Sequence, residues 1–173
     1  MLRLIGSIEA CKQSIDHAPL LPYYEKKFRD DAMLRAAHHG THLEGNELNL
    51  SQAQRVLEGE QVMGRERDVQ EVINYRKVME FISELHVGSQ KEKVDKELVC
   101  KLHSCIVDRV LSSEKKGQLR KTQVVIRNSF TGEVSFRPPE ATVVPEQLAD
   151  LFAYINSTTE DDINPLLKSG IVH

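Results

Sequence analysis

The 173-residue sequence has no tryptophan, and aromatic residues make up only 5% of it. Proteins that bind single-stranded nucleic acid stack the bases on such side chains, so this class of binding is disfavoured. Positive charge is not in excess either, because the formal net charge is −3 and the densest cationic stretches are short and flanked by acids. We therefore expect no nucleic-acid partner.

Cysteine and long apolar runs are also scarce. The cysteines are Cys11, Cys100 and Cys105; their odd number and the lack of a Cys-x-x-Cys pair argue against a disulfide framework and a structural zinc site. No apolar run approaches the length of a membrane span, and the first ten residues are too short and too interrupted for a signal peptide. We expect reduced thiols, no membrane association and a cytoplasmic protein.

What the sequence does contain is typical of a soluble globular protein, with 40% hydrophobic and 28% charged residues. A chain of this length forms one domain, or a small domain with a helical extension, and buries about two thirds of its unfolded surface. Apolar residues at a spacing of three and four predict a mostly α-helical fold. Helices are expected over residues 23–43, 50–58 and 65–85, the last of them ending near Gly88. A further helix is expected from the cap residue Asp95 to a stop at Gly117. Two more are expected to begin at Pro145 and at Pro165.

Residues 1–22 are expected to be an irregular lead-in, closed by Pro19 and Pro22. One β element is expected, a hairpin over residues 122–137, where apolar and polar residues alternate on both sides of a turn at 129–132. A two-stranded hairpin is marginal by itself in water, so it must lie on a helical body or be steadied by something bound to it. Without further information, an exposed surface hairpin is the simpler interpretation.

The chain is organised around Gly40-Thr41-His42-Leu43-Glu44-Gly45-Asn46. Gly45 and Asn46 favour a left-handed helix end, and Asn49 with Gln52, or Ser51 with Gln54, can cap the next helix. Glu44 is thereby held between two helices. A lone glutamate at a helix end is most often a solvated surface charge. His103, which lies beside the apolar stripe of its helix, is interpreted as a structural histidine because no acid or nucleophile is spaced to act with it.

Four stretches carry a family resemblance: Thr41 to Leu50 with its Glu-Gly-Asn core, the helix bearing Glu66-Arg67-Asp68 and Asn74-Tyr75, Gly117-Gln118-Leu119-Arg120, and the hairpin with its Pro138-Pro139 exit. Their order resembles the Fic family of AMP-transferring enzymes, from about residue 20 onward. Gly40 stands where the family has Ser or Thr, and Leu119 where it has an aromatic residue. The implied fold is a Fic-type helical bundle with one hairpin, divided into a lead-in arm (1–22), an N-terminal inhibitory helical region (23–88) and the front part of the Fic core (95–173).

The resemblance also implies roles. Glu44, Gly45 and Asn46 would be regulatory, with Glu44 as the inhibitor that occupies the space of the ATP γ-phosphate. The hairpin would be the flap that docks a target protein by strand addition. Its implied docking residues are Thr122, Val124, Ile126, Thr131, Gly132, Val134 and Phe136.

The family's catalytic loop, of the type His-x-Phe-x-Asp/Glu-Gly-Asn-Gly-Arg, does not occur in this sequence. Its histidine, its metal-binding acid and its phosphate-binding glycines are therefore lacking, and His173 does not replace them. We expect no catalytic or metal-binding residue in this chain and no tight binding of ATP or Mg²⁺, which the full-length family enzyme would use.

Two functional hypotheses follow. The chain is the regulatory and target-docking portion of a truncated Fic-type protein adenylyltransferase, or it is a non-enzymatic helical module that binds proteins or inhibits an intact Fic protein in trans. The resemblance is to an enzyme family, but whether this chain takes part in an enzyme is left open, as is the formation of a homo-oligomer.

Overall fold

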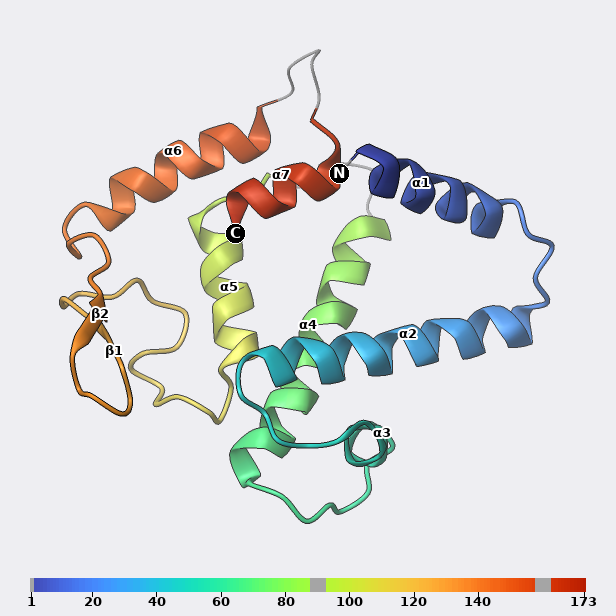
Figure 1. Cartoon of the computed structure of the whole chain (residues 1–173), viewed down its shortest axis with the longest axis horizontal. Coiled ribbons are helices and arrows are strands. Elements are labelled where there is room, and N and C mark those ends of the chain that lie inside the picture. Colours follow the sequence, from blue (N-terminus) through green and yellow to red (C-terminus); the bar gives the residue numbers. More distant parts are fainter. Residues whose placement is uncertain (1, 88–92, 158–162) are drawn as a thin grey trace.

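The computed structural model describes residues 2–87, 93–157 and 163–173. In this described part the fold is mostly helical, with one antiparallel two-stranded hairpin, as predicted (Figure 1). The elements in chain order are α1 (Leu2–Asp16), α2 (Pro22–Leu43), α3 (Leu50–Leu57), α4 (Glu66–Val87), α5 (Lys96–Ile106), β1 (Ile126–Arg127), β2 (Val134–Phe136), α6 (Val144–Asn156) and α7 (Pro165–Val172). The helix end expected near Gly88 lies outside the described residues.

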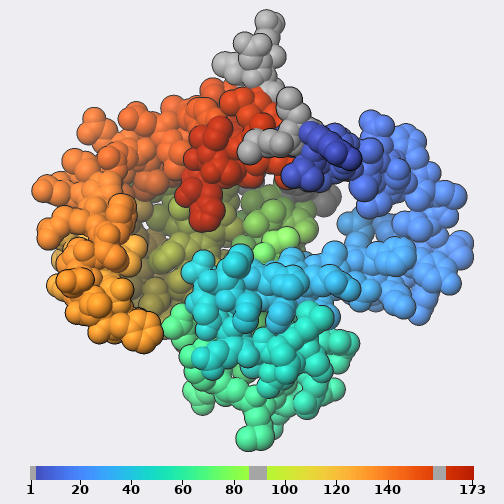
Figure 2. Space-filling model, viewed as in Figure 1, coloured from blue at the N-terminus to red at the C-terminus, as the bar shows by residue number. Residues whose placement is uncertain are grey.

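The hydrophobic core lies where α3 and α4 pack against the C-terminal half of α2. Its buried members are Ala37, Leu48, Ala53, Val56 and Val72. The apolar stripe of α2 enters this core through Leu34 and Ala37, but Phe28 does not take part and remains 53% exposed. The N-terminal half of α2 instead extends away from the core (Figures 1 and 2).

Local capping signals in the sequence are confirmed. Asn49 and Gln52 form a reciprocal capping box at the start of α3, so the alternative with Ser51 is not the one adopted. The Asp95 side chain accepts a hydrogen bond from the backbone of Leu98 at the start of α5. Asn164 does the same for the backbone of Leu166, with Pro165 in the first turn of α7.

The prediction of an irregular lead-in over residues 1–22 is wrong for most of that segment, because residues 2–16 form α1. The pattern Leu4, Ile8, Cys11 and Ile15 has the four-three-four spacing of one helix face. This face remains largely exposed, since α1 does not pack extensively on any other described element. Figure 2 shows an open gap between α1 with the start of α2 and the middle of the molecule, while Asn164, just before α7, contacts Glu9 of α1.

The helix predicted to reach Gly117 also differs, because α5 ends at Ile106. The buried side-chain amide of Asn74 donates to the carbonyls of Ile106 (3.0 Å) and Asp108 (2.7 Å), which captures carbonyl groups at the end of the helix. Arg109 then adopts a positive φ of 57°, which an α-helix does not accommodate. Gly117, at φ 62°, instead marks a later turn and accommodates the close approach of the Cys100 carbonyl.

The buried residues of the described chain all lie between Ala37 and Asn74. Helices α5, α6 and α7 have half-buried apolar residues but none that is fully buried. The first half of the molecule thus has its own core, whereas the helices of the second half bury their apolar faces only in part. No helix in the described ranges is both long and apolar enough to cross a membrane.

Candidate functional site

The turn after α2 has the geometry of a Schellman motif. The N–H of Gly45 donates to the carbonyl of His42 (3.0 Å), and the N–H of Asn46 donates to the carbonyl of Thr41 (3.2 Å). Gly45 has a φ of 89°, a conformation that glycine adopts without a steric penalty. The predicted helix stop is therefore confirmed, and its geometry defines the backbone position of Glu44.

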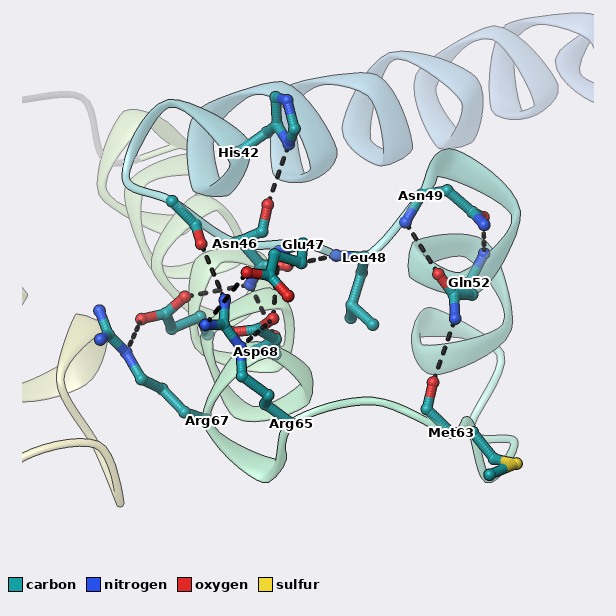
Figure 3. A network of polar contacts seen from close by, with 12 residues as sticks. His42, Asn46, Glu47, Leu48, Asn49, Gln52, Met63, Arg65, Arg67 and Asp68 are labelled. Carbon is teal, nitrogen blue, oxygen red and sulfur yellow. Dashed lines mark hydrogen bonds and ion pairs between the residues drawn. The ribbon is translucent and has the colours of Figure 1, made fainter.

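Asn46 anchors this turn to α4 (Figure 3). Its side chain is buried, with 2% exposure, and its amide group donates to the backbone carbonyl of Asp68 (2.9 Å) and to the Glu71 carboxylate (3.0 Å). The carbonyl oxygen of the same side chain accepts a hydrogen bond from the backbone N–H of Leu48 (3.1 Å). Because both ends of the amide are satisfied, the residue holds the turn and helix together without an unpaired buried group.

A second tie runs through Arg65 and the buried carboxylate of Asp68. Asp68 accepts hydrogen bonds from Arg65 Nε (2.9 Å) and from the backbone N–H of Glu47 (3.1 Å). The Arg65 guanidinium also donates to the carbonyl of Gly45 (2.9 Å). The backbone on either side of Asn46 is thus fixed to the start of α4 by one positively charged side chain, Arg65, and one negatively charged side chain, Asp68 (Figure 3).

Glu44 itself is exposed, and its side chain forms no hydrogen bond or ion pair with any residue in the described ranges. It caps the C-terminal end of α2, where its backbone N–H donates to the carbonyl of Thr41 (3.0 Å). A rigid turn therefore presents a solvated carboxylate. The inhibitory role of this carboxylate stays a prediction.

Three histidines lie on the last turns of α2, beside the anchored turn. The rings of His38 and His42 are stacked at 5.7 Å, and His42 Nδ1 is 2.9 Å from the carbonyl oxygen of Asn46, to which it donates in the corresponding tautomer. His38 Nδ1 is buried without a hydrogen-bond partner among the described residues. Burial, followed by repulsion from His39 and His42, lowers the pKa of His38, while the backbone of Leu48 acts in the opposite direction. The structure thus favours the neutral form of His38.

Gly40 is required by close packing against α4. A Cβ atom placed on Gly40 would lie 2.5 Å from Cε2 of the Tyr75 ring, which is closer than real Cβ contacts permit. A larger residue at position 40 therefore cannot be accommodated unless Tyr75 moves. This explains how a chain that resembles the Fic family can carry glycine where serine or threonine is usual.

The predicted hairpin is present, but its strands are shorter than the alternating pattern suggested. Ile126 pairs with Phe136 and Arg127 with Val134, with a register irregularity between the two pairs. Continued in the same register, Val124 would face Pro138, which has no N–H group to extend the ladder. The side chain of Gln123 donates to the Pro138 carbonyl instead (3.0 Å), so the predicted positions Thr122 and Val124 lie at the base of the hairpin rather than in a strand.

The other predicted docking residues lie in the strands and the tip. Ile126, Val134 and Phe136 are in the paired strands and are all exposed, while Thr131 and Gly132 are in the turn. Asn128 accepts hydrogen bonds from the N–H groups of Phe130 and Thr131, and Gly132 takes a φ of 73°. The tip is therefore ordered by local contacts, and both faces of the hairpin are open to solvent. Their docking role remains a prediction.

Two residue groups of the site could not be identified from local sequence patterns. Arg65 and Asp68 hold the turn from 20 or more residues away, and no spacing rule connects them to Gly45 or Glu47. His103, in contrast, has the structural role expected of it, because its Nδ1 accepts a hydrogen bond from the backbone N–H of Gly117 (3.0 Å).

The expectation that this chain does not bind ATP or Mg²⁺ tightly stays a prediction. Within the described ranges no group of three or more His, Cys, Asp or Glu side chains is placed to hold a metal ion. The sequence also lacks a glycine-rich loop that could surround phosphate groups.

Comparison with known proteins agrees with the family resemblance. No family model matches the chain. It is 22% identical over 173 residues to the protein adenylyltransferase fic-1 of Caenorhabditis elegans, covering 99% of this chain and 32% of the relative. It is 26% identical over 138 residues to fic-1 of Caenorhabditis briggsae, covering 79% of this chain and 26% of the relative. The chain is thus distantly similar to Fic proteins.

Solved structures show that its fold is the Fic fold. A Fic family protein from Desulfovibrio desulfuricans G20 superposes with a TM-score of 0.73 at 20% identity, covering 97% of this chain and 48% of that one. A Fic domain containing signaling protein from Bacteroides thetaiotaomicron VPI-5482 gives a TM-score of 0.75 at 22% identity, covering 89% and 57%. The chain thus spans about a third or less of the curated relatives and about half of these Fic structures.

Proposed function

We propose that this chain is the regulatory and target-docking portion of a Fic-type protein adenylyltransferase, which transfers AMP from ATP to a hydroxyl side chain of a target protein. Glu44 is its inhibitory residue and the hairpin of β1 and β2 is its docking element. The catalytic loop, ATP and Mg²⁺ belong to a segment that this sequence does not contain. The target is a protein that pairs with the hairpin edge, and the compartment is the cytoplasm.

The observation that carries the proposal is the combination of a rigid turn with an unengaged carboxylate. Asn46, Arg65 and Asp68 fix the backbone on either side of Glu44, yet the Glu44 side chain has no partner in the described chain. A carboxylate held about 4 Å from a phosphate charge, at an effective dielectric of about 20, opposes its binding by about 4 kcal/mol. Inhibition by such repulsion requires that the carboxylate is held in a fixed position and that no group of the described chain neutralises it.

The hairpin supports the docking role. Its strands expose their outer edges and their apolar side chains, including Ile126 and Phe136, each 56% exposed. An exposed strand edge is a template for another strand, which is how many proteins bind extended peptides. The prolines at its exit prevent the ladder from extending and so keep the paired region short.

The test uses a single polypeptide in which residues 1–173 are followed by the part of C. elegans fic-1 beyond the matched stretch. It is incubated with Mg²⁺ and ATP labelled at the α-phosphate. We expect weak self-labelling, and an increase of at least tenfold for Glu44→Gly and Glu44→Gln. Glu44 is exposed, so neither change should alter folding, which is checked by thermal melting.

The chain offers a matched control in Glu58→Gly. Leu57-Glu58-Gly59 repeats Leu43-Glu44-Gly45, and Glu58 also follows a helix and precedes a glycine of positive φ. This variant should leave labelling unchanged. If Glu44 and Glu58 variants label alike in a polypeptide that transfers AMP, Glu44 is not the inhibitor.

A second candidate, a non-enzymatic module that acts in trans on a Fic protein, is supported by the incompletely buried apolar faces of α5 to α7, on which Leu166 and Ile171 of α7 are exposed. Such faces suit a partner surface. Added to separately expressed, active fic-1, the chain would then lower its labelling of targets, and Glu44→Gly would remove this inhibition. Inhibition that survives Glu44→Gly would instead indicate binding through the hairpin.

A further inference from the structure

A groove of about 530 Å³ lies apart from the Glu44 turn, between α5, the segment before the hairpin and the start of α6. It is open to solvent along one side. Its lining residues come from three distant stretches of the chain: Lys96 and Cys100, then the run from Gly117 to Lys121, then Ala141, Thr142 and Pro145. None of the residues that anchor the turn contributes to it.

The groove is cationic in a protein whose net charge is −3. Lys96, Arg120 and Lys121 bring three positive charges, and no acidic residue is among the described residues that line it. Neither lysine forms an ion pair within the described ranges, and both are exposed. The described lining of the groove therefore has the opposite sign to the molecule as a whole.

Arg120 joins the groove to the hairpin. Its guanidinium donates to the carbonyls of Thr122 and Pro139, one on each side of the hairpin base. These partners are neutral, so the positive charge of Arg120 remains available, and a guanidinium has five N–H donors of which two are used here. Arg120 thus fixes the hairpin base and contributes charge to the groove wall.

The start of α6 adds to this character. Val143 precedes the helix and provides no side-chain cap, so the first backbone N–H groups of α6 have no side-chain acceptor at that position. Thr142 and Pro145 of this same stretch line the groove. The helix dipole gives this end a partial positive charge; Glu146 in the first turn acts against it but is not among the residues that line the groove.

We propose that this groove binds an acidic stretch of the target protein beside the strand that pairs with the hairpin. The proposal rests on the docking role given to the hairpin above. Lys121 lies five residues before Ile126, a distance of about 17 Å in extended chain, so one peptide can reach both elements. The open side and the spread of the three cations favour an extended peptide over a small enclosed anion.

The test measures fluorescence anisotropy of a labelled octaglutamate peptide titrated with the full chain, with octaglutamine as the uncharged reference. We expect octaglutamate to bind, octaglutamine not to bind at the same protein concentrations, and salt to weaken the complex. Lys96→Glu combined with Lys121→Glu should weaken binding at least tenfold. These lysines are exposed and unpaired, so thermal melting should be unchanged.

The matched control is Lys26→Glu combined with Lys27→Glu, which makes the same change in net charge at exposed positions of α2. It should retain most of the affinity. Equal losses in both double variants, or no binding of octaglutamate, would overturn the groove as a specific site. Displacement of the peptide by inorganic phosphate at equal concentration would also overturn it, in favour of a small-anion site. None of these results depends on AMP transfer, so a failure here is distinct from a failure of the proposed function.

Discussion

The side-chain amide of Asn46 donates a hydrogen bond to the backbone carbonyl of Asp68 over 2.9 Å, which fixes the turn after α2 to the first turn of α4. The two residues are 22 positions apart in the sequence. The place of Glu44 is therefore set by its neighbour Asn46 and by α4, and not by any contact of its own carboxylate. In the Glu-Gly-Asn stretch the structural contacts are thus made by Asn46, while the regulatory role of Glu44 stays a prediction.

Asn46→Ala is expected to lower the free energy of unfolding by about 2–4 kcal/mol, because it leaves the Asp68 carbonyl and the Leu48 N–H without their buried partner. Glu44→Ala should change it by less than about 0.5 kcal/mol, since its side chain is exposed and has no partner among the described residues. Urea denaturation measures both. Equal effects of the two substitutions would contradict this division of roles.

Gly40→Ala is expected to destabilise the chain by about 1 kcal/mol or more, because the steric conflict with Tyr75 outweighs the higher helix propensity of alanine. Gly6→Ala is the matched control: Gly6 also lies inside a helix, but a Cβ there meets no atom within 4 Å. That change should be neutral or stabilising by up to about 1 kcal/mol. The difference between the two variants is measured by thermal melting. Combining Gly40→Ala with Tyr75→Leu, which shortens the opposing side chain, should recover part of the lost stability.

Local sequence signals predicted the parts of the site that local contacts determine. Gly45 ends α2 and Asn49 starts α3 because each acts on backbone groups within a few residues. The hairpin was also predictable from alternation and its glycine turn. The strands of the hairpin are shorter than the alternation predicts, because Pro138 would have to pair with Val124 and has no N–H group for that pairing.

Long-range packing determined what local patterns could not predict. The contact of Asn46 with Asp68, the fit of Gly40 against Tyr75 and the capture of the α5 end by Asn74 each join residues more than 20 positions apart. Helix α1 is a different case, because its periodic apolar residues were present but its proximity to Pro19 and Pro22 suggested an irregular arm. The prolines mark the boundary after α1 and the start of α2.

The free energy of unfolding should depend on pH through His38. Burial and the neighbouring His39 and His42 lower its pKa below the usual 6.5 in the folded state. As pH falls below 6.5, the unfolded chain binds the proton first, so stability decreases until the pH passes the lowered folded pKa, and above pH 6.5 this group has no effect.

His38→Asn should therefore flatten the decline in the free energy of unfolding between pH 7 and pH 5. The slope of this decline gives the number of protons taken up on unfolding, and the substitution should lower that number by less than one. Urea denaturation at several pH values measures this slope. An unchanged slope in His38→Asn would show that the folded chain accommodates the charged ring.

We expect this chain to provide one part of a Fic fold, with its own core in residues 37–74, and we expect helices α5 to α7, which have no fully buried residue, to pack on a further surface. Amide hydrogen exchange followed by mass spectrometry tests it most directly. For the chain alone, we predict exchange in α6 and α7 at least about tenfold faster than in the middle of α4, and slowing of α6 and α7 when the fic-1 catalytic segment is joined. Protection of α6 and α7 equal to that of α4 in the chain alone would contradict the account.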